Sequence, residues 1–146
     1  MQNFYFYNPT KIIFGANTIA QLNDLVPENA KILILYGGSS AEKTGTLSEV
    51  RHALGNRTIH LFGGIEPNPT YETLMEAVKQ VHQKKLDFLI AVGGGSVIDG
   101  AKFVSVAAQE ANYIDDPWEI VQTQGMNIKK AIPLATILTL PATGSE

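Results

Sequence analysis

The stretch FLIAVGGGSVIDGAK, residues 88–102, decides the fold class of this chain. It leads from a short apolar, β-rich segment through three consecutive glycines into a segment that we expect to be helical from Ser96 to about Gln109. Glycine loses more conformational freedom on folding than any other residue, so a triplet indicates that bare backbone is needed there. A strand, a glycine-rich turn and a helix in this order are typical of the β-to-α connections of a parallel sheet.

Similar units occur on both sides of this stretch. Short apolar runs predict further strands at 31–36, 57–62 and within 131–140, and apolar residues at helical spacing predict helices at 41–54 and from 70 to about 84. Strands that alternate with helices predict an α/β fold with a parallel, Rossmann-like sheet flanked by helices. Such sheets bind ligands beyond the carboxyl ends of their strands, where the glycine-rich segments 37–40, 63–64 and 93–96 fall.

Composition narrows the class of protein. The chain has 146 residues, 45% of them hydrophobic, which suggests one domain with a substantial core. A net charge of −3 without a basic stripe argues against a nucleic-acid partner, and the absence of cysteine excludes disulfides. No apolar run approaches the roughly 20 residues of a membrane span, and no secretory leader is recognisable. We therefore expect a cytoplasmic protein with no membrane partner.

The N-terminal segment is rich in aromatic and β-branched residues. The runs at 3–7 and 11–14 lie around Asn8-Pro9 and predict a small edge hairpin, whose outer strand could pair with another subunit. Asn17 is expected to cap a short helix that follows it.

The glycine turn has a chemical interpretation. Unpaired N–H groups at a helix N-terminus, together with the helix dipole, favour an anion, and missing Cβ atoms let a phosphate approach the main chain. The Ser96 hydroxyl can cap the helix or contact a phosphate, Asp99 can bond back to the cap, and Lys102 could pair with Asp99.

Two known phosphate-binding motifs nearly match this turn and fail. G-x-G-x-x-G would need glycine where Ile98 stands, and G-x-x-x-x-G-K would need lysine where Ala101 stands. The local pattern therefore leaves two interpretations open: a phosphate-binding turn, or a tight connection with a purely structural cap.

Two separated segments carry a resemblance to a known family. GGGSVIDGAK at 93–102 and TLPATGSE at 139–146 resemble the paired signature of the iron-containing, or group III, alcohol dehydrogenases. The likeness extends over YGGSS at 36–40, FGGIEPNPTYETL at 62–74 and DPWEIVQT at 116–123, and is nearest to the NADPH-dependent butanol dehydrogenase and aldehyde reductase branch. It implies a fold similar to dehydroquinate synthase, with residues 1–146 as the dinucleotide-binding domain and a helical, metal-binding domain expected after residue 146 and absent from this chain.

The resemblance also assigns roles to individual residues. It implies that the cofactor pyrophosphate contacts the glycine turn through Gly94, Gly95 and Ser96, with Asp99 close by. It further implies that Thr139, Leu140 and Thr143 line the cofactor cleft from the other side. Asn68 matches a family position near the cofactor, although a turn or capping asparagine is an equally good interpretation.

The end of the strand at 31–36 bears on cofactor choice. NAD-binding sites often place an acid there to bond the ribose 2′-hydroxyl, and that acid would repel a 2′-phosphate. Here Gly37, Gly38, Ser39 and Ser40 follow the strand, and the first carboxylate is Glu42. Glycines leave room, serines offer hydroxyl donors and the next residue is a lysine, so we predict NADP(H) rather than NAD(H). The alternative is that these are ordinary turn residues.

The implied reaction is hydride exchange between the nicotinamide and a small-molecule alcohol or aldehyde. In the family a divalent metal, iron or zinc, polarises the substrate and is held by one aspartate and three histidines. His52, His60 and His82 show no ligand spacing, so we assign no catalytic and no metal residue within 1–146 and expect little activity from this chain alone.

The resemblance further implies a homodimer. Two alternatives remain open at this point: an enzyme of the same fold that resembles glycerol dehydrogenase or dehydroquinate synthase, and a non-catalytic nucleotide-binding module.

Overall fold

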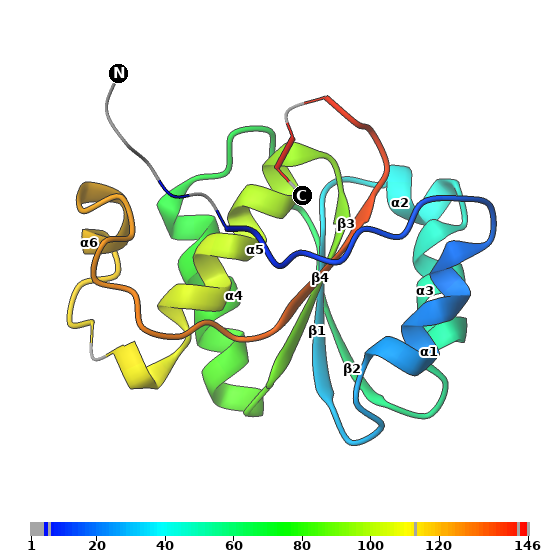
Figure 1. Cartoon of the computed structure of the whole chain (residues 1–146), viewed down its shortest axis with the longest axis horizontal. Helices are drawn as coiled ribbons and strands as arrows, with labels where there is room; N and C mark the ends of the chain where they lie inside the picture. Colours follow the sequence, from blue (N-terminus) through cyan, green and yellow to red (C-terminus); the bar gives the residue numbers. More distant parts are fainter. Residues whose placement is uncertain (1–4, 6, 113, 143, 146) are drawn as a thin grey trace.

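A four-stranded parallel sheet forms the centre of the molecule (Figure 1). The computed structural model describes residues 5, 7–112, 114–142, 144 and 145. The strands are β1 (Lys31–Tyr36), β2 (Thr58–Phe62), β3 (Phe88–Gly93) and β4 (Leu134–Leu138), in the order β2-β1-β3-β4. All three pairings are parallel, which confirms the predicted α/β class. The chain first places β2 on one side of β1 and then places β3 on the opposite side of β1. The direction in which strands are added to the sheet therefore reverses between β1 and β3.

Helices cover both faces of this sheet (Figure 1). One layer contains the 3₁₀ helix η1 (Thr18–Gln21), α1 (Leu22–Leu25), α2 (Ser40–Lys43) and α3 (Thr46–Leu54). The other contains α4 (Tyr71–Lys84) and α5 (Gly95–Ala107), and beyond them lie η2 (Glu110–Asn112) and α6 (Glu119–Gln122).

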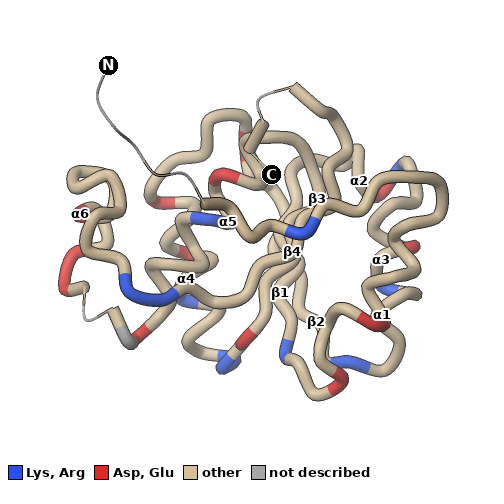
Figure 2. The backbone as a smooth tube through the Cα atoms, viewed as in Figure 1, with Lys and Arg blue, Asp and Glu red and all other residues tan. Residues whose placement is uncertain are grey.

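The two central strands are buried on both faces, as their uninterrupted apolar sequences predict. Residues 32–35 of β1 and 89–92 of β3 are completely buried. Alternate side chains enter different layers: Leu33 and Leu89 join the core beneath α4 and α5, whereas Ile34 joins the core beneath α3. The charged residues lie mostly outside these strands, and Figure 2 shows Lys and Arg spread over both helical layers.

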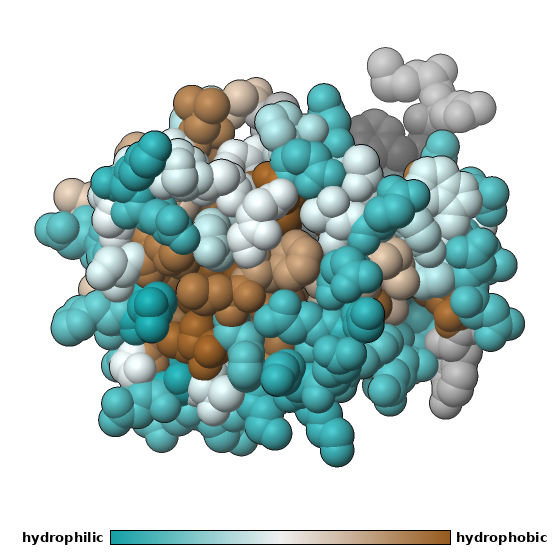
Figure 3. Space-filling model, turned by 180° about the vertical axis from the view of Figure 1, so that it is seen from behind, coloured by the Kyte–Doolittle hydropathy of each residue, from teal (hydrophilic) through white to brown (hydrophobic). Residues whose placement is uncertain are grey.

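Strand β2 forms one edge of the sheet. Its Leu61 side chain is 38% exposed and its Ile59 and Phe62 are half-buried. Seen from behind, apolar side chains gather in one area of the surface (Figure 3).

The Arg57 side chain joins the elements at the amino end of the sheet. Its guanidinium donates hydrogen bonds to the carbonyl oxygens of Asn23 within α1, of Val26 and Pro27 directly after it, and of Leu54, which ends α3. A positive charge that satisfies the last carbonyls of two helices stabilises both C-termini.

The predicted N-terminal hairpin is wrong for the residues that the structure describes. Residues 7–14 form no strand, and residues 3, 4 and 6 lie outside the described part of the chain. Asn8 Oδ1 instead accepts hydrogen bonds from the Thr10 N–H and hydroxyl, and Ile12 and Phe14 are 78% and 99% exposed. β-propensity reflects packing on a half-buried surface, and these side chains have none. The subunit contact expected there stays a prediction.

Asn17 precedes a helix as predicted, but not as its side-chain cap. Its φ of 59° places it in the left-handed region, it makes no capping hydrogen bond, and the first turn is 3₁₀. A capping residue normally has extended backbone, whereas asparagine also tolerates the left-handed conformation.

Candidate functional site

The carboxyl ends of all four strands meet at one edge of the sheet, at the top of Figure 1. The reversal of strand order between β1 and β3 makes this edge a topological switch point, the place where open α/β sheets bind their ligands. Most of the described residues that are predicted to bind a dinucleotide follow β1, β2, β3 or β4 at this edge. The others, such as Asp99, lie in the first turns of α5.

The glycine turn presents three main-chain donors at this edge. Gly93 ends β3, Gly94 is the N-cap of α5 with extended backbone, and α5 is 13 residues long. The N–H groups of Val97 and Ile98 both donate to the Gly94 carbonyl, at 3.1 and 3.2 Å. Within the described part of the chain, no group accepts a hydrogen bond from the N–H of Gly94, Gly95 or Ser96. These donors therefore remain available to an anion.

Gly93 and Gly94 differ in what an added side chain would meet. A Cβ on Gly93 would lie 2.7 Å from Val97 Cγ2 and 2.9 Å from its Cβ, so packing alone excludes a side chain there. A Cβ on Gly94 would meet only Leu140 Cβ, at 4.0 Å, which is ordinary contact. A purely structural turn explains Gly93 but leaves Gly94 unexplained, whereas close approach of a ligand to the backbone accounts for it.

Ser96 and Asn68, predicted separately for the site, contact each other. The Asn68 N–H donates to Ser96 Oγ at 3.2 Å, and Asn68 has a left-handed φ of 52°. Of the two roles considered for the Ser96 hydroxyl, capping α5 is wrong, since Gly94 occupies the cap and Ser96 lies in the first turn, while contact with a phosphate stays a prediction. Asp99 is exposed on α5, and in the described part of the chain it neither bonds back to the cap nor pairs with Lys102.

The loop that presents Asn68 is held by Glu66. Its Oε1 accepts hydrogen bonds from the Thr70 N–H and the Thr73 hydroxyl, both at 2.9 Å, and Thr70 in turn caps α4 by accepting from the Thr73 N–H. Hydrogen bonds from the Thr70 and Glu66 backbone, then the Thr73 hydroxyl, lower the pKa of Glu66 from 4.5 to about 2. The charged carboxylate is thus the form that fixes this loop.

We expect this loop to make stability depend on pH in acid. Because the folded-state pKa of Glu66 is depressed, its contribution is complete above the unfolded value of 4.5 and is lost as pH falls towards 2. As the pH is lowered from 5 to about 2, the thermal unfolding temperature should therefore fall more steeply for the wild type than for Glu66→Gln. Equal slopes for the two proteins would show that the Glu66 carboxylate does not hold the folded loop.

The segment after β4 lies beside the glycine turn. The Thr139 N–H donates to the Gly93 carbonyl at 3.0 Å, and Leu140, which is 67% exposed, is the nearest neighbour of a Cβ built on Gly94. Thr143, the third residue predicted here, lies outside the described residues. The structure thus brings Thr139 and Leu140 to the glycine turn.

The turn after β1 has open space. Gly38 has no atom within 4 Å of a Cβ built on it, whereas a Cβ on Gly37 would lie 3.3 Å from the Ile65 carbonyl. Ser39 is the N-cap residue of α2, Ser40 is the first residue of α2, and both are exposed.

Sequence reasoning missed one contact at this turn. The Tyr36 hydroxyl donates to Glu42 Oε1 at 3.1 Å, and burial together with the nearby Glu42 carboxylate raises the pKa of Tyr36. An aromatic strand end followed by an acid six residues later is too common a pattern to predict the bond.

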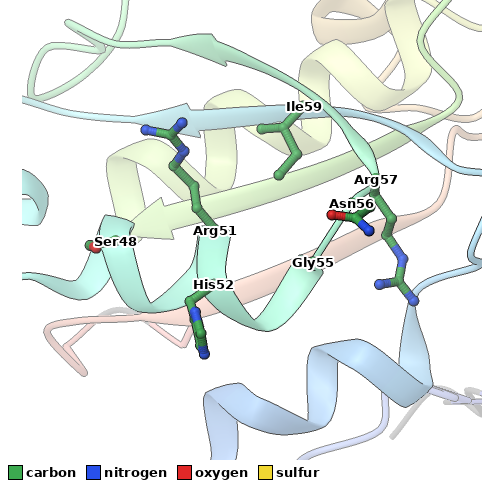
Figure 4. A pocket seen from close by; sticks show the side chains of 7 residues that line it. All are labelled: Ser48, Arg51, His52, Gly55, Asn56, Arg57 and Ile59. Atoms are coloured by element: carbon green, nitrogen blue, oxygen red, sulfur yellow. The ribbon is translucent and has the colours of Figure 1, made fainter.

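No metal centre is formed by the described residues. They contain no group of three or more His, Cys, Asp or Glu side chains placed to hold an ion. His82 Nε2 is hydrogen-bonded to the Ala108 carbonyl at 3.0 Å, and His60 lies on β2. His52 lines a shallow hollow with Ser48, Arg51, Gly55, Asn56, Arg57 and Ile59 (Figure 4). This hollow contains none of the predicted cofactor residues.

Comparison with known proteins agrees with this description. The chain is 56% identical over 146 residues to the NADPH-dependent aldehyde reductase YqhD of Escherichia coli K12, matching all of this chain and 38% of that protein. It is 42% identical over 149 residues to a probable NADH-dependent butanol dehydrogenase of Bacillus subtilis 168, again over 38% of that protein. A substrate- and cofactor-free structure of YqhD superposes on 96% of this chain and 37% of its own with a TM-score of 0.90 and 54% identity.

The parallel sheet, its switch point and its glycine turn define a doubly wound α/β protein. The family model for iron-containing alcohol dehydrogenases matches residues 9–146. The chain therefore belongs to the iron-containing alcohol dehydrogenase family, as its two signature segments predict, and spans about 38% of the length of the relatives it matches. In the described part of the chain, no helix is long and apolar enough to cross a membrane.

Proposed function

We propose that this chain is the dinucleotide-binding domain of an NADP(H)-dependent alcohol dehydrogenase or aldehyde reductase. The observation that carries the proposal is the set of three adjacent N–H groups, Gly94 to Ser96, that have no acceptor in the described part of the chain and point from the start of a long helix. Membership of the family supports the same reading. The residues at this edge fit a pyrophosphate, because they offer main-chain donors, a helix N-terminus and no Cβ at Gly94.

The chain's own residues bind and orient the cofactor in this proposal. The turn from Gly94 to Ser96 holds the pyrophosphate, and Asn68, fixed against Ser96, sits beside it. Thr139 and Leu140 border the turn from the β4 side. When bound, the cofactor supplies or accepts the hydride.

We assign substrate polarisation to none of the described residues. They contain no metal-ligand cluster, so no step can be assigned to a metal here. We propose that iron or zinc is held by residues beyond this chain, and that a small alcohol or aldehyde is bound with it.

The alternatives are less well supported. The relatives are named as alcohol and aldehyde oxidoreductases, which disfavours a glycerol dehydrogenase- or dehydroquinate synthase-like enzyme. A non-catalytic nucleotide-binding module would use the same turn. Hydride transfer by the full-length protein would separate it from the proposed enzyme.

The proposal predicts a preference between dinucleotides. Because the turn after β1 has open space at Gly38 and offers two exposed serine hydroxyls, NADPH should bind the chain more tightly than NADH. Isothermal titration calorimetry with each cofactor in turn measures both dissociation constants. Failure of both dinucleotides to bind would refute the site, and tighter binding of NADH would refute the choice of NADP(H).

A further inference from the structure

A carboxylate stands next to the turn that we propose receives the 2′-phosphate. Glu42 lies in α2, two residues after Ser40, and its Oε1 accepts a hydrogen bond from the Tyr36 hydroxyl at 3.1 Å. Tyr36 ends β1 immediately before Gly37. The hydrogen bond therefore links the two sides of the turn from Gly37 to Ser39.

The position of the Tyr36 ring is itself fixed. A Cβ on Gly63, in the loop after β2, would lie only 2.7 Å from the Tyr36 hydroxyl oxygen and 2.8 Å from its Cε2, so the ring lies directly against that backbone. The Tyr36 side chain also packs with the core beneath α3. A ring held on these sides presents its hydroxyl in one place, which in turn limits where the Glu42 carboxylate can move.

The charge of Glu42 is not neutralised by a neighbouring cation. In the described part of the chain, Glu42 forms no ion pair, and its hydrogen bond comes from a neutral phenol. Lys43 follows it on α2 without pairing to it. The Glu42 carboxylate therefore lies at the rim of the turn without an ion-pair partner among the described residues.

We propose that Glu42, positioned by Tyr36, is a specificity-determining residue that weakens the binding of a 2′-phosphorylated dinucleotide relative to one with a free ribose 2′-hydroxyl. The inference rests on the proposed function, because it assumes that the adenosine ribose lies over the turn from Gly37 to Ser40. A carboxylate repels the phosphate dianion and can accept a hydrogen bond from a 2′-hydroxyl. The glycines and serines of the turn thus admit a 2′-phosphate, while Glu42 limits the preference for it.

The test is the effect of Glu42→Gln on the ratio of the two dissociation constants. The substitution keeps the shape and the hydrogen bond from Tyr36 but removes the charge. NADPH should bind about three- to tenfold more tightly to the variant, since removing one like charge from the neighbourhood of a dianion in near-aqueous surroundings changes the affinity by about this factor. NADH should bind equally well or more weakly.

Two matched variants and a salt series sharpen the test. Glu28→Gln makes the same charge change before β1, at the opposite end of the sheet, and should leave the ratio unchanged. Tyr36→Phe frees the carboxylate and should give a ratio between those of the wild type and Glu42→Gln. The gain for Glu42→Gln should shrink between 0.05 and 0.5 M salt (about 14 and 4 Å of screening length), because these charges are exposed.

The outcomes separate this inference from the proposed function. If the wild type binds neither NADPH nor NADH, the proposed function fails and the inference falls with it. If both bind and Glu42→Gln shows the same ratio as Glu28→Gln, the inference alone is overturned.

Discussion

Gly94→Asp should abolish dinucleotide binding and leave the fold intact. The new carboxylate would stand beside the three unpaired N–H groups of residues 94 to 96, where it would fill the space of the pyrophosphate and repel it. A like charge within about 4 Å at a protein surface costs about 4 kcal/mol, so the affinity for NADPH should fall by about a hundredfold or more. Calorimetric titration with NADPH measures this loss.

The controls for this prediction use the same position. A Cβ on Gly94 has only Leu140 for a neighbour, at 4.0 Å, and the backbone there is extended, so a side chain can begin there without a clash at its Cβ. Gly94→Asn has nearly the same shape as the aspartate without its charge and should lose clearly less affinity. Thermal unfolding should be similar for all three proteins. Unchanged NADPH affinity in Gly94→Asp would show that the cofactor does not approach this turn.

Local sequence patterns predicted the elements whose packing is two-sided or strongly periodic. The apolar runs of β1 and β3 read as buried strands because each is covered by helices on both faces. Helix α4 was predictable because Thr70 supplies its cap and because Leu74, Val78 and Val81 recur on its buried face. In these segments the local preference and the tertiary environment favour the same structure.

The predictions that were wrong or missing concern residues whose structure depends on distant parts of the chain. The residues at 11–14 favour a strand locally, yet no sheet edge pairs with them in the structure. Ser96 is a good capping residue, but its hydroxyl accepts a hydrogen bond from Asn68, 28 residues earlier in the chain, while Gly94 takes the cap. The bond between Tyr36 and Glu42 depends on how the turn after β1 folds back. Contacts of this kind arise from tertiary structure, and no local pattern contains them.

Gly93→Ala should be the most destabilising small substitution in the turn. Its new methyl would lie 2.7 Å from Val97 Cγ2 and 2.9 Å from Val97 Cβ. Val97 is buried and β-branched, so it cannot rotate away, and the clash must displace the start of α5 from β3. Overpacking of this kind costs about 1–3 kcal/mol in the free energy of unfolding, which urea denaturation measures.

Comparison with Gly94→Ala separates packing from ligand approach. That variant adds the same methyl one residue later, in open space, and its free energy of unfolding should stay within about 0.5 kcal/mol of the wild type or rise slightly, because alanine restricts the unfolded chain. The displaced α5 carries the N–H groups of residues 95 and 96, so Gly93→Ala should weaken both NADPH binding and the stability of the fold. Gly94→Ala should weaken NADPH binding and leave the stability unchanged. Equal stability of the two variants would mean that Val97 does not constrain the turn, and that Gly93, like Gly94, is needed only for the ligand.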